Sequence, residues 1–309
     1  WGHQTYAEFL AAWYLKKHDV SISKIKSLIT HPDDPNKKII PQLGETAAWL
    51  AGMIPEVFQS IVRAEPDLLL RSEVATGDSP RRAALVEALL QLYENEHVFD
   101  RDREHYKNWS HPGLADQLRP YIIDKTKEVI VRRVAIDIAE SCNVQSLNDA
   151  LLAIVLDPTD VLAIRVQAAY AIGRIGDDAT RKGLKPLVAV DATDDLWDEL
   201  KGSILKAFWP SHITAEELFP LLRPPRNEGF FGAYRDFISS DLANNLTPQD
   251  LVPALHFAAC MPQKRHEMDT SFEALMDGIV VKAWENMAVP GVTDALARFV
   301  AARLKYHDD

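Results

Sequence analysis

The densest group of side chains that could do chemistry lies at residues 94–111 (ENEHVFDRDREHYKNWSH). Three histidines, His97, His105 and His111, stand here among carboxylates, and both groups are common ligands for Zn²⁺ and related ions. Their spacings of eight and six residues differ from the four-residue spacing of a helical metal-binding pair. The pattern therefore favours a solvated loop or an insertion between repeats over a metal site.

The same stretch carries side chains suited to holding a partner. Arginine and tryptophan are over-represented where the binding energy of an interface concentrates. Phe230 and Phe231 form a second candidate, because they follow a glycine-containing turn and could project from the surface. The sequence thus predicts a partner-contact surface made of Arg101, Arg103, Lys107, Trp109, Phe230 and Phe231.

Motifs for hydrolysis and for phosphate binding are missing from the sequence. It has no G-x-S-x-G nucleophile elbow and no G-x-x-x-x-G-K-[ST] phosphate loop. The two cysteines, Cys142 and Cys260, lie at the ends of apolar helical stretches, so we interpret them as small core residues. We therefore predict no catalytic residue, no metal site and no cofactor in this chain. Two cysteines also make no disulfide scaffold, which favours a reducing, cytoplasmic location.

The elements that must position these residues are predicted to be helices throughout. Apolar residues recur at helical spacing from residue 5 onward, and no run shows the alternation of a half-buried strand. Residues 31–42, with three prolines, are expected to be a loop. After it we predict helices at 43–53, 55–64, 79–95, 113–122, 126–142, 146–156, 160–175, 178–189, 194–208, 214–222, 230–244, 248–260, 268–287 and 290–305. Apolar helical faces are expected to bury Trp13, Trp49, Trp197, Trp209 and Trp284.

A repeat is visible within this helical pattern. The segment VRRVAIDIA, which contains Arg132, resembles IRVQAAYAI, which contains Arg165 33 positions later. A looser third copy places Lys201 at the corresponding position. An Asp-Pro turn at Asp157 precedes the second copy. These features resemble HEAT repeats, in which an Asp turn and a buried Arg or Lys tie neighbouring repeats together. The resemblance implies an all-α, HEAT-like α-solenoid, a right-handed superhelix of antiparallel helix pairs.

The opening segment, WGHQTYAEFLAA, resembles the end of the winged-helix domain in NACHT-type signal-transduction ATPases. The resemblance implies that His3 contacts the nucleotide phosphates in an intact protein, with ATP or ADP and Mg²⁺ bound by an upstream module. It also implies that a helical superstructure follows as a sensor. The first residue is Trp1 rather than Met, so we expect a piece of a longer chain, with residues 1–42 as a helical junction and 43–309 as the repeat region, interrupted by an insertion at about 94–112.

Composition limits the remaining function classes. The formal net charge of −11 disfavours general attraction to nucleic acid or anionic lipid, and no segment is apolar enough to span a bilayer. We therefore expect a non-catalytic, protein-binding sensor region of a NACHT-like ATPase, possessing a defence function by family analogy. Two alternatives remain open. One is a nucleic-acid-binding HEAT protein that uses the lysines near the start of the chain. The other is an enzyme with an unrecognised site at 94–111.

Overall fold

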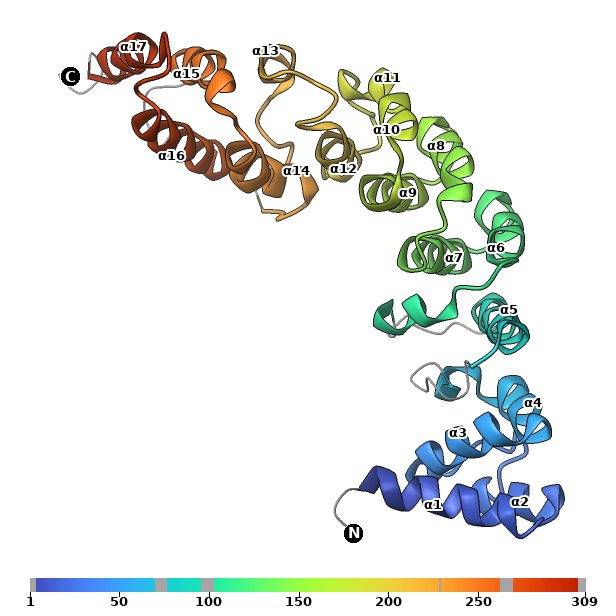
Figure 1. The fold of residues 1–309 in the computed structure, drawn as a ribbon. Helices are drawn as coiled ribbons and strands as arrows, with labels where there is room; N and C mark the ends of the chain where they lie inside the picture. The colour runs from blue at the N-terminus through green and yellow to red at the C-terminus, as the bar shows by residue number, and fades with distance from the viewer. Residues whose placement is uncertain (1–3, 70–76, 96–102, 228, 262–268, 305–309) are drawn as a thin grey trace. The chain divides into compact units, whose positions relative to one another are not determined.

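A computed structural model describes residues 4–69, 77–95, 103–227, 229–261 and 269–304 (Figure 1). The described residues are helical and form no strand, and their one β-type contact is an isolated antiparallel bridge between Thr30 and Ile39. The predicted all-α class is therefore confirmed. The chain divides into two compact units, residues 1–147 and 148–309, which are described separately.

The first unit is built from seven α-helices and four short 3-10 helices in the described residues. The α-helices are α1 (Gln4–Lys17), α2 (Ile22–Ile29), α3 (Gly44–Met53), α4 (Pro55–Ala64), α5 (Ser79–Asn95), α6 (Leu114–Ile123) and α7 (Val129–Ser141). The 3-10 helices are η1 (Pro41–Leu43), η2 (Pro66–Leu69), η3 (Arg103–Trp109) and η4 (Gln145–Leu147). Helix α1 packs against α3, α3 against α4, and α6 against α7.

The second unit continues the pattern of packed helices. Its α-helices are α8 (Asn148–Leu156), α9 (Leu162–Ile175), α10 (Asp178–Gly183), α11 (Lys185–Val188), α12 (Glu199–Phe208), α13 (Ala215–Leu218), α14 (Ala233–Asp236), α15 (Leu251–Cys260), α16 (Thr270–Glu285) and α17 (Val292–Leu304). It also contains 3-10 helices η5 (Phe219–Leu221) and η7 (Pro248–Asp250) and a π-helix, η6 (Phe237–Leu242). Helix α9 packs between α8 and α12, and α12 also contacts α14.

The predicted helical junction, residues 1–42, packs within the first unit as far as it is described, from residue 4 onward. Helix α1 packs against α3 and α2 contacts α4, so both belong to the first unit. The structure also divides the predicted repeat region after residue 147. The proline-rich loop 31–42, at the end of the predicted junction, packs against the following helices: Ile39 is buried, and its backbone N–H donates to Glu65 at 2.8 Å.

The predicted repeat has a physical counterpart. Buried Arg132 donates from Nε to the carbonyl of Ile122 at 3.2 Å, and buried Arg165 makes the same bond to Val155, also at 3.2 Å. In each case the carbonyl lies ten residues before the arginine, one residue before the end of the preceding helix. Each arginine thus ties two successive helices together, as the HEAT resemblance implies.

The turns before these arginines also match. The Asp124 carboxylate accepts from the N–H and the hydroxyl of Thr126 at 2.9 and 2.7 Å. Asp157 accepts from Thr159 at the same two distances. The two copies therefore share a turn, a helix and a buried cation. The right-handed superhelix itself stays a prediction.

Candidate functional site

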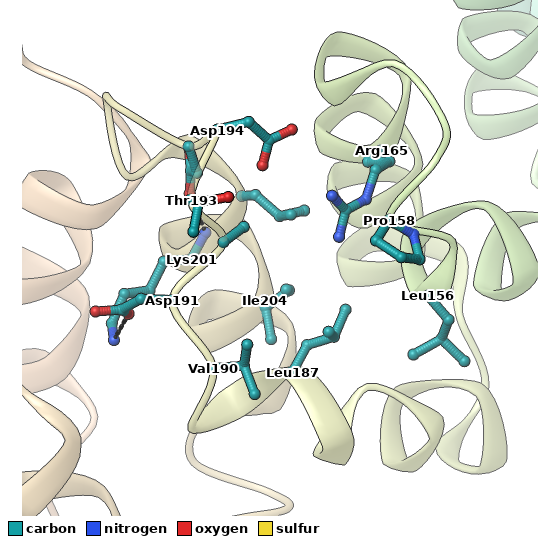
Figure 2. Close-up of a pocket in the computed structure, with 13 residues that line it drawn as sticks. Leu156, Pro158, Arg165, Leu187, Val190, Asp191, Thr193, Asp194, Lys201 and Ile204 are labelled. Atoms are coloured by element: carbon teal, nitrogen blue, oxygen red, sulfur yellow. Dashed lines mark hydrogen bonds and ion pairs between the residues drawn. The ribbon is translucent and has the colours of Figure 1, made fainter.

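A groove of about 580 Å³ opens on the second unit beside α9 and α12 (Figure 2). One wall comes from the end of α8, the turn at Pro158 and Arg165 of α9, and the other from α11, the loop after it and α12. As drawn in Figure 2, the lower part of the groove is apolar and the upper part is polar. The lining residues are Leu156, Pro158, Arg165, Leu187, Val190, Asp191, Ala192, Thr193, Asp194, Asp195, Leu200, Lys201 and Ile204.

The loop at residues 189–198 shapes this groove and is held in place by Asp195. The Asp195 carboxylate is buried and accepts from the backbone N–H groups of Glu199 at 2.9 Å and Lys201 at 3.0 Å. These are free N–H groups at the start of α12, which a carboxylate outside the helix can satisfy. Burial raises the pKa of Asp195, opposed by the backbone hydrogen bonds it accepts. Helix α12 therefore begins at Glu199 rather than at the predicted residue 194.

Two carboxylates of this loop, Asp191 and Asp198, belong to a charged cluster. Asp191 accepts from Lys201 Nζ and from Arg223 Nε, both at 2.5 Å. Burial by itself would raise the pKa of Asp191, but the hydrogen bonds from Arg223 and Lys201 outweigh it and lower the pKa to about 2. The Asp191 carboxylate is therefore ionised at neutral pH, and it neutralises the buried ammonium of Lys201.

Arg223 joins the same cluster to a second carboxylate. It donates to Asp198 from both terminal nitrogens, at 2.5 and 3.1 Å, and Asp198 is almost fully buried. The backbone at Asp198 is left-handed, with φ of +56°, a conformation that Asp tolerates better than most residues. Tyr234 accepts from the Arg223 N–H at 3.0 Å and donates to the Arg223 carbonyl at 2.9 Å. Helix α14 is thereby attached to the cluster.

The buried cations of the second unit differ in how they are paired. Lys201 pairs with Asp191, and buried Arg235 of α14 pairs with Asp269 at 2.6 Å. Arg165, of which only 3% is exposed, donates from Nε to the Val155 carbonyl at 3.2 Å. Figure 2 shows its guanidinium turned into the groove, and no described carboxylate lies within ion-pair distance of it.

An apolar patch is exposed on the same unit, and we define it as Leu196, Trp197, Phe230 and Phe231. Leu196 is 63% exposed, Trp197 48% and Phe231 84%. The rings of Trp197 and Phe230 contact edge to face, with centroids 4.9 Å apart, which joins the two segments of the patch. A depression beside Phe230 and Phe231 is lined by Tyr170, Glu199, Lys206, Gly232, Ala233 and Asp236.

The predicted contact residues have different outcomes. Phe230 is half-buried and Phe231 is exposed. Lys107 is exposed, but Trp109 is completely buried and packs against Tyr106, with ring centroids 5.0 Å apart. Trp109 is therefore a core residue, and its assignment to a contact surface was wrong. His3 and Arg101 lie outside the described residues, as does the side chain of Arg103.

The tryptophan prediction needs a similar correction. Trp209 is buried, and Trp49 is partly buried against Phe9. In contrast, Trp13, Trp197 and Trp284 are 41–67% exposed, so their assignment to the core was wrong. Helical spacing identifies the side of a helix on which an aromatic lies, but it does not say whether another helix covers that side.

Lys201 was predicted from the repeat, but its cluster partners Asp191, Asp198 and Arg223 were not predicted from the sequence. Arg223 lies between the helices predicted at 214–222 and 230–244, so the sequence assigned it no role. One signal was present for Asp191: it precedes Lys201 by ten residues, the same interval that separates each repeat arginine from its carbonyl partner. No comparable signal linked Arg223 to Asp198.

The described residues were also searched for a metal site and for a membrane-spanning helix. Among the described residues, no group of His, Cys, Asp and Glu is arranged to hold a metal ion, and none of their helices has the length and apolar character to cross a membrane. His111 is hydrogen-bonded to Gln117 at 3.0 Å, and burial lowers its pKa.

No protein-family model, curated protein or solved structure matches this chain.

Proposed function

We propose that this chain is the protein-binding sensor region of a NACHT-type signal-transduction ATPase. The observation that carries the protein-binding part is the apolar patch, in which Leu196, Trp197 and Phe231 are exposed and Phe230 is half-buried. Leaving such side chains in water is unfavourable, since burying one large apolar side chain is worth about 1.5–3 kcal/mol. A contiguous exposed patch with a tryptophan is typical of a protein-binding surface.

The structure also supports the patch as a preformed surface. Trp197 is held next to Asp198, whose carboxylate is fixed by Arg223 and by the backbone N–H of Arg226 at 2.7 Å. Phe230 and Phe231 precede Ala233, whose N–H donates to Glu199 at 2.8 Å. Both segments of the patch are therefore anchored to the start of α12, so little conformational entropy would be lost when a partner binds.

The link to a nucleotide switch comes from the resemblance of residues 1–12, including His3, to NACHT-type ATPases. A bound ligand would activate such an ATPase only if it binds the open form more tightly than the resting form. ATP or ADP with Mg²⁺ would be bound upstream, in the cytoplasm, and a defence function follows by family analogy. A Walker-type phosphate loop encoded upstream in the same reading frame would support this assignment, and a start codon directly before Trp1 would contradict it.

Photo-crosslinking in the full-length protein tests the contact surface. Phe231 is replaced by a photo-reactive phenylalanine analogue, and the same analogue replaces Val281, which is also exposed, as the control position. We expect a protein to be captured from position 231 and not from position 281. Trp197→Ser combined with Phe231→Ser should then weaken the binding of that purified protein at least 30-fold, since a buried aromatic anchor is worth about 2 kcal/mol or more.

Two outcomes would overturn the proposal. Equal capture from both positions would show that the patch is not a specific surface. Capture that disappears after nuclease treatment, together with a steep fall in affinity with rising salt, would favour the alternative of a nucleic-acid-binding protein.

A further inference from the structure

The groove beside α9 and α12 contains a buried cation that lacks a counter-charge. Arg165 uses Nε for the Val155 carbonyl, and its two terminal nitrogens have no ion-pair partner among the described residues. Asp194 and Asp195 line the same groove but make no ion pair with Arg165. Arg165 lines the open groove without a carboxylate partner, so a ligand that brings an anion can supply its counter-charge.

The other buried cations of this unit indicate what kind of anion fits. Lys201 pairs with the carboxylate of Asp191, and Arg235 with that of Asp269. An arginine presents two parallel N–H donors that match the two oxygens of a carboxylate. At Arg165 the protein supplies no such carboxylate, and the guanidinium is turned into an open groove (Figure 2).

The lower part of the groove adds a second requirement. It is lined by apolar side chains, among them Leu187, Val190 and Ile204 (Figure 2). A ligand that fills both parts must carry an apolar group close to a carboxylate. The C-terminal residue of a protein meets this requirement, because its carboxylate and its side chain are attached to the same carbon. The volume of about 580 Å³ is in the range of known ligand pockets.

We propose that this groove binds the apolar C-terminal residue of a protein partner, with Arg165 holding the terminal carboxylate and the apolar wall holding the side chain. The inference rests on the proposed function only in taking the partner to be a protein. The groove and the apolar patch are tested with different probes, so that either proposal can be overturned without affecting the other.

The test uses pentapeptides that are fluorescently labelled at the N-terminus, with mixed residues at four positions and leucine at the last. Binding to the whole chain is followed by fluorescence anisotropy. We expect saturable binding of the free acids and at least tenfold weaker binding of the matching C-terminal amides. N-acetyl-leucine, a free small acid, should compete at least tenfold less well than unlabelled peptide.

Two variants locate the binding. Arg165→Gln should weaken it at least tenfold, with the fold checked by circular dichroism. Val190→Glu keeps the test independent of folding, since Val190 is 54% exposed, and it should have the same effect by placing a negative charge in the groove. The matched control is Val281→Glu, at a valine that is 56% exposed on α16, and it should leave binding unchanged.

The proposal is overturned by equal binding of acids and amides, by the absence of saturable binding, or by Val190→Glu having no more effect than Val281→Glu. N-acetyl-leucine competing as well as the peptide would assign the groove to a free small acid and so would also overturn it. If the peptides fail while variants in the apolar patch abolish partner binding, only the groove proposal is lost.

Discussion

At the scale of single residues, Asp191 is the point where the charged cluster depends most on protonation. Its carboxylate holds two cations, Lys201 and Arg223, each at 2.5 Å, and Lys201 is almost completely buried. Removing one partner of such a pair leaves the other charge buried and uncompensated, which costs more than the pair itself contributes. The cluster also attaches the groove loop to α12 and to the segment at Arg223. Loss of the cluster would therefore release the loop that lines the groove.

We expect Asp191→Asn to lower the free energy of unfolding by about 2 kcal/mol at pH 7, the scale of its pKa shift from 3.8 to about 2. A lowered pKa means that the folded state favours the ionised carboxylate. The stabilisation is therefore complete above about pH 5 and is lost as the pH falls toward 2. Urea unfolding at several pH values should show the difference in the free energy of unfolding between wild type and variant shrinking over that range.

The control for this prediction is Asp194→Asn, the same chemical change at an exposed carboxylate of the same loop. It should change the free energy of unfolding by less than about 0.5 kcal/mol. A gap between wild type and Asp191→Asn that stays constant from pH 7 to pH 2 would contradict the role given to the Asp191 charge.

The residues show where sequence reasoning works and where it stops. Arg132, Arg165 and Lys201 were found because a repeated local pattern marks them, and all three are buried. Trp109 was misassigned because its neighbours in sequence are charged, whereas its burial depends on packing against Tyr106 and the core of the unit. Arg223 was missed because its partner Asp198 is 25 residues away and no pattern connects them.

At the scale of elements, the helices were predicted well where local signals are strong. Helix α4 was predicted at 55–64 and found at Pro55–Ala64, because Pro55 favours the first helical position. The prediction at 178–189 differs, since the structure breaks this helix at Leu184 into α10 and α11. The prediction at 230–244 also differs: the helix begins at Ala233 and continues as the π-helix η6. Apolar spacing does not distinguish a π-turn from an α-turn.

The contact between α12 and α14 depends on a glycine, and this yields a second prediction. A Cβ on Gly202 would lie 2.1 Å from the backbone nitrogen of Tyr234, a clash that only movement of a helix can relieve. We expect Gly202→Ala to lower the free energy of unfolding by about 2 kcal/mol or more, although alanine is the better helix former. Thermal or urea unfolding measures the effect.

Gly173 in α9 provides the matched control. A Cβ there would lie 3.6 Å from the Ala207 Cβ, which is an ordinary van der Waals contact. Gly173→Ala should therefore stabilise the protein by about 0.5–1 kcal/mol, through helix propensity alone. Equal effects of the two substitutions would mean that the close approach of α12 to α14 does not limit stability.

At the scale of the whole molecule, the two compact units lead to a prediction about folding. The second unit contains its own packed series of helices, from α8 on α9 to α15 on α16 and α17. It also holds both the groove and the apolar patch. A unit with its own core is expected to fold alone and to unfold cooperatively.

We therefore expect residues 148–309, expressed alone, to keep a helical circular dichroism spectrum and a single cooperative urea transition. Because Asp191 and its partners all lie in this unit, Asp191→Asn should destabilise the fragment by the same amount as it destabilises one transition of the whole chain. Gly202→Ala should behave likewise. A fragment that has lost its helical signal, or that unfolds without cooperativity, would show that the second unit depends on residues 1–147 for its stability. The groove and the patch would then have to be studied only in the whole chain.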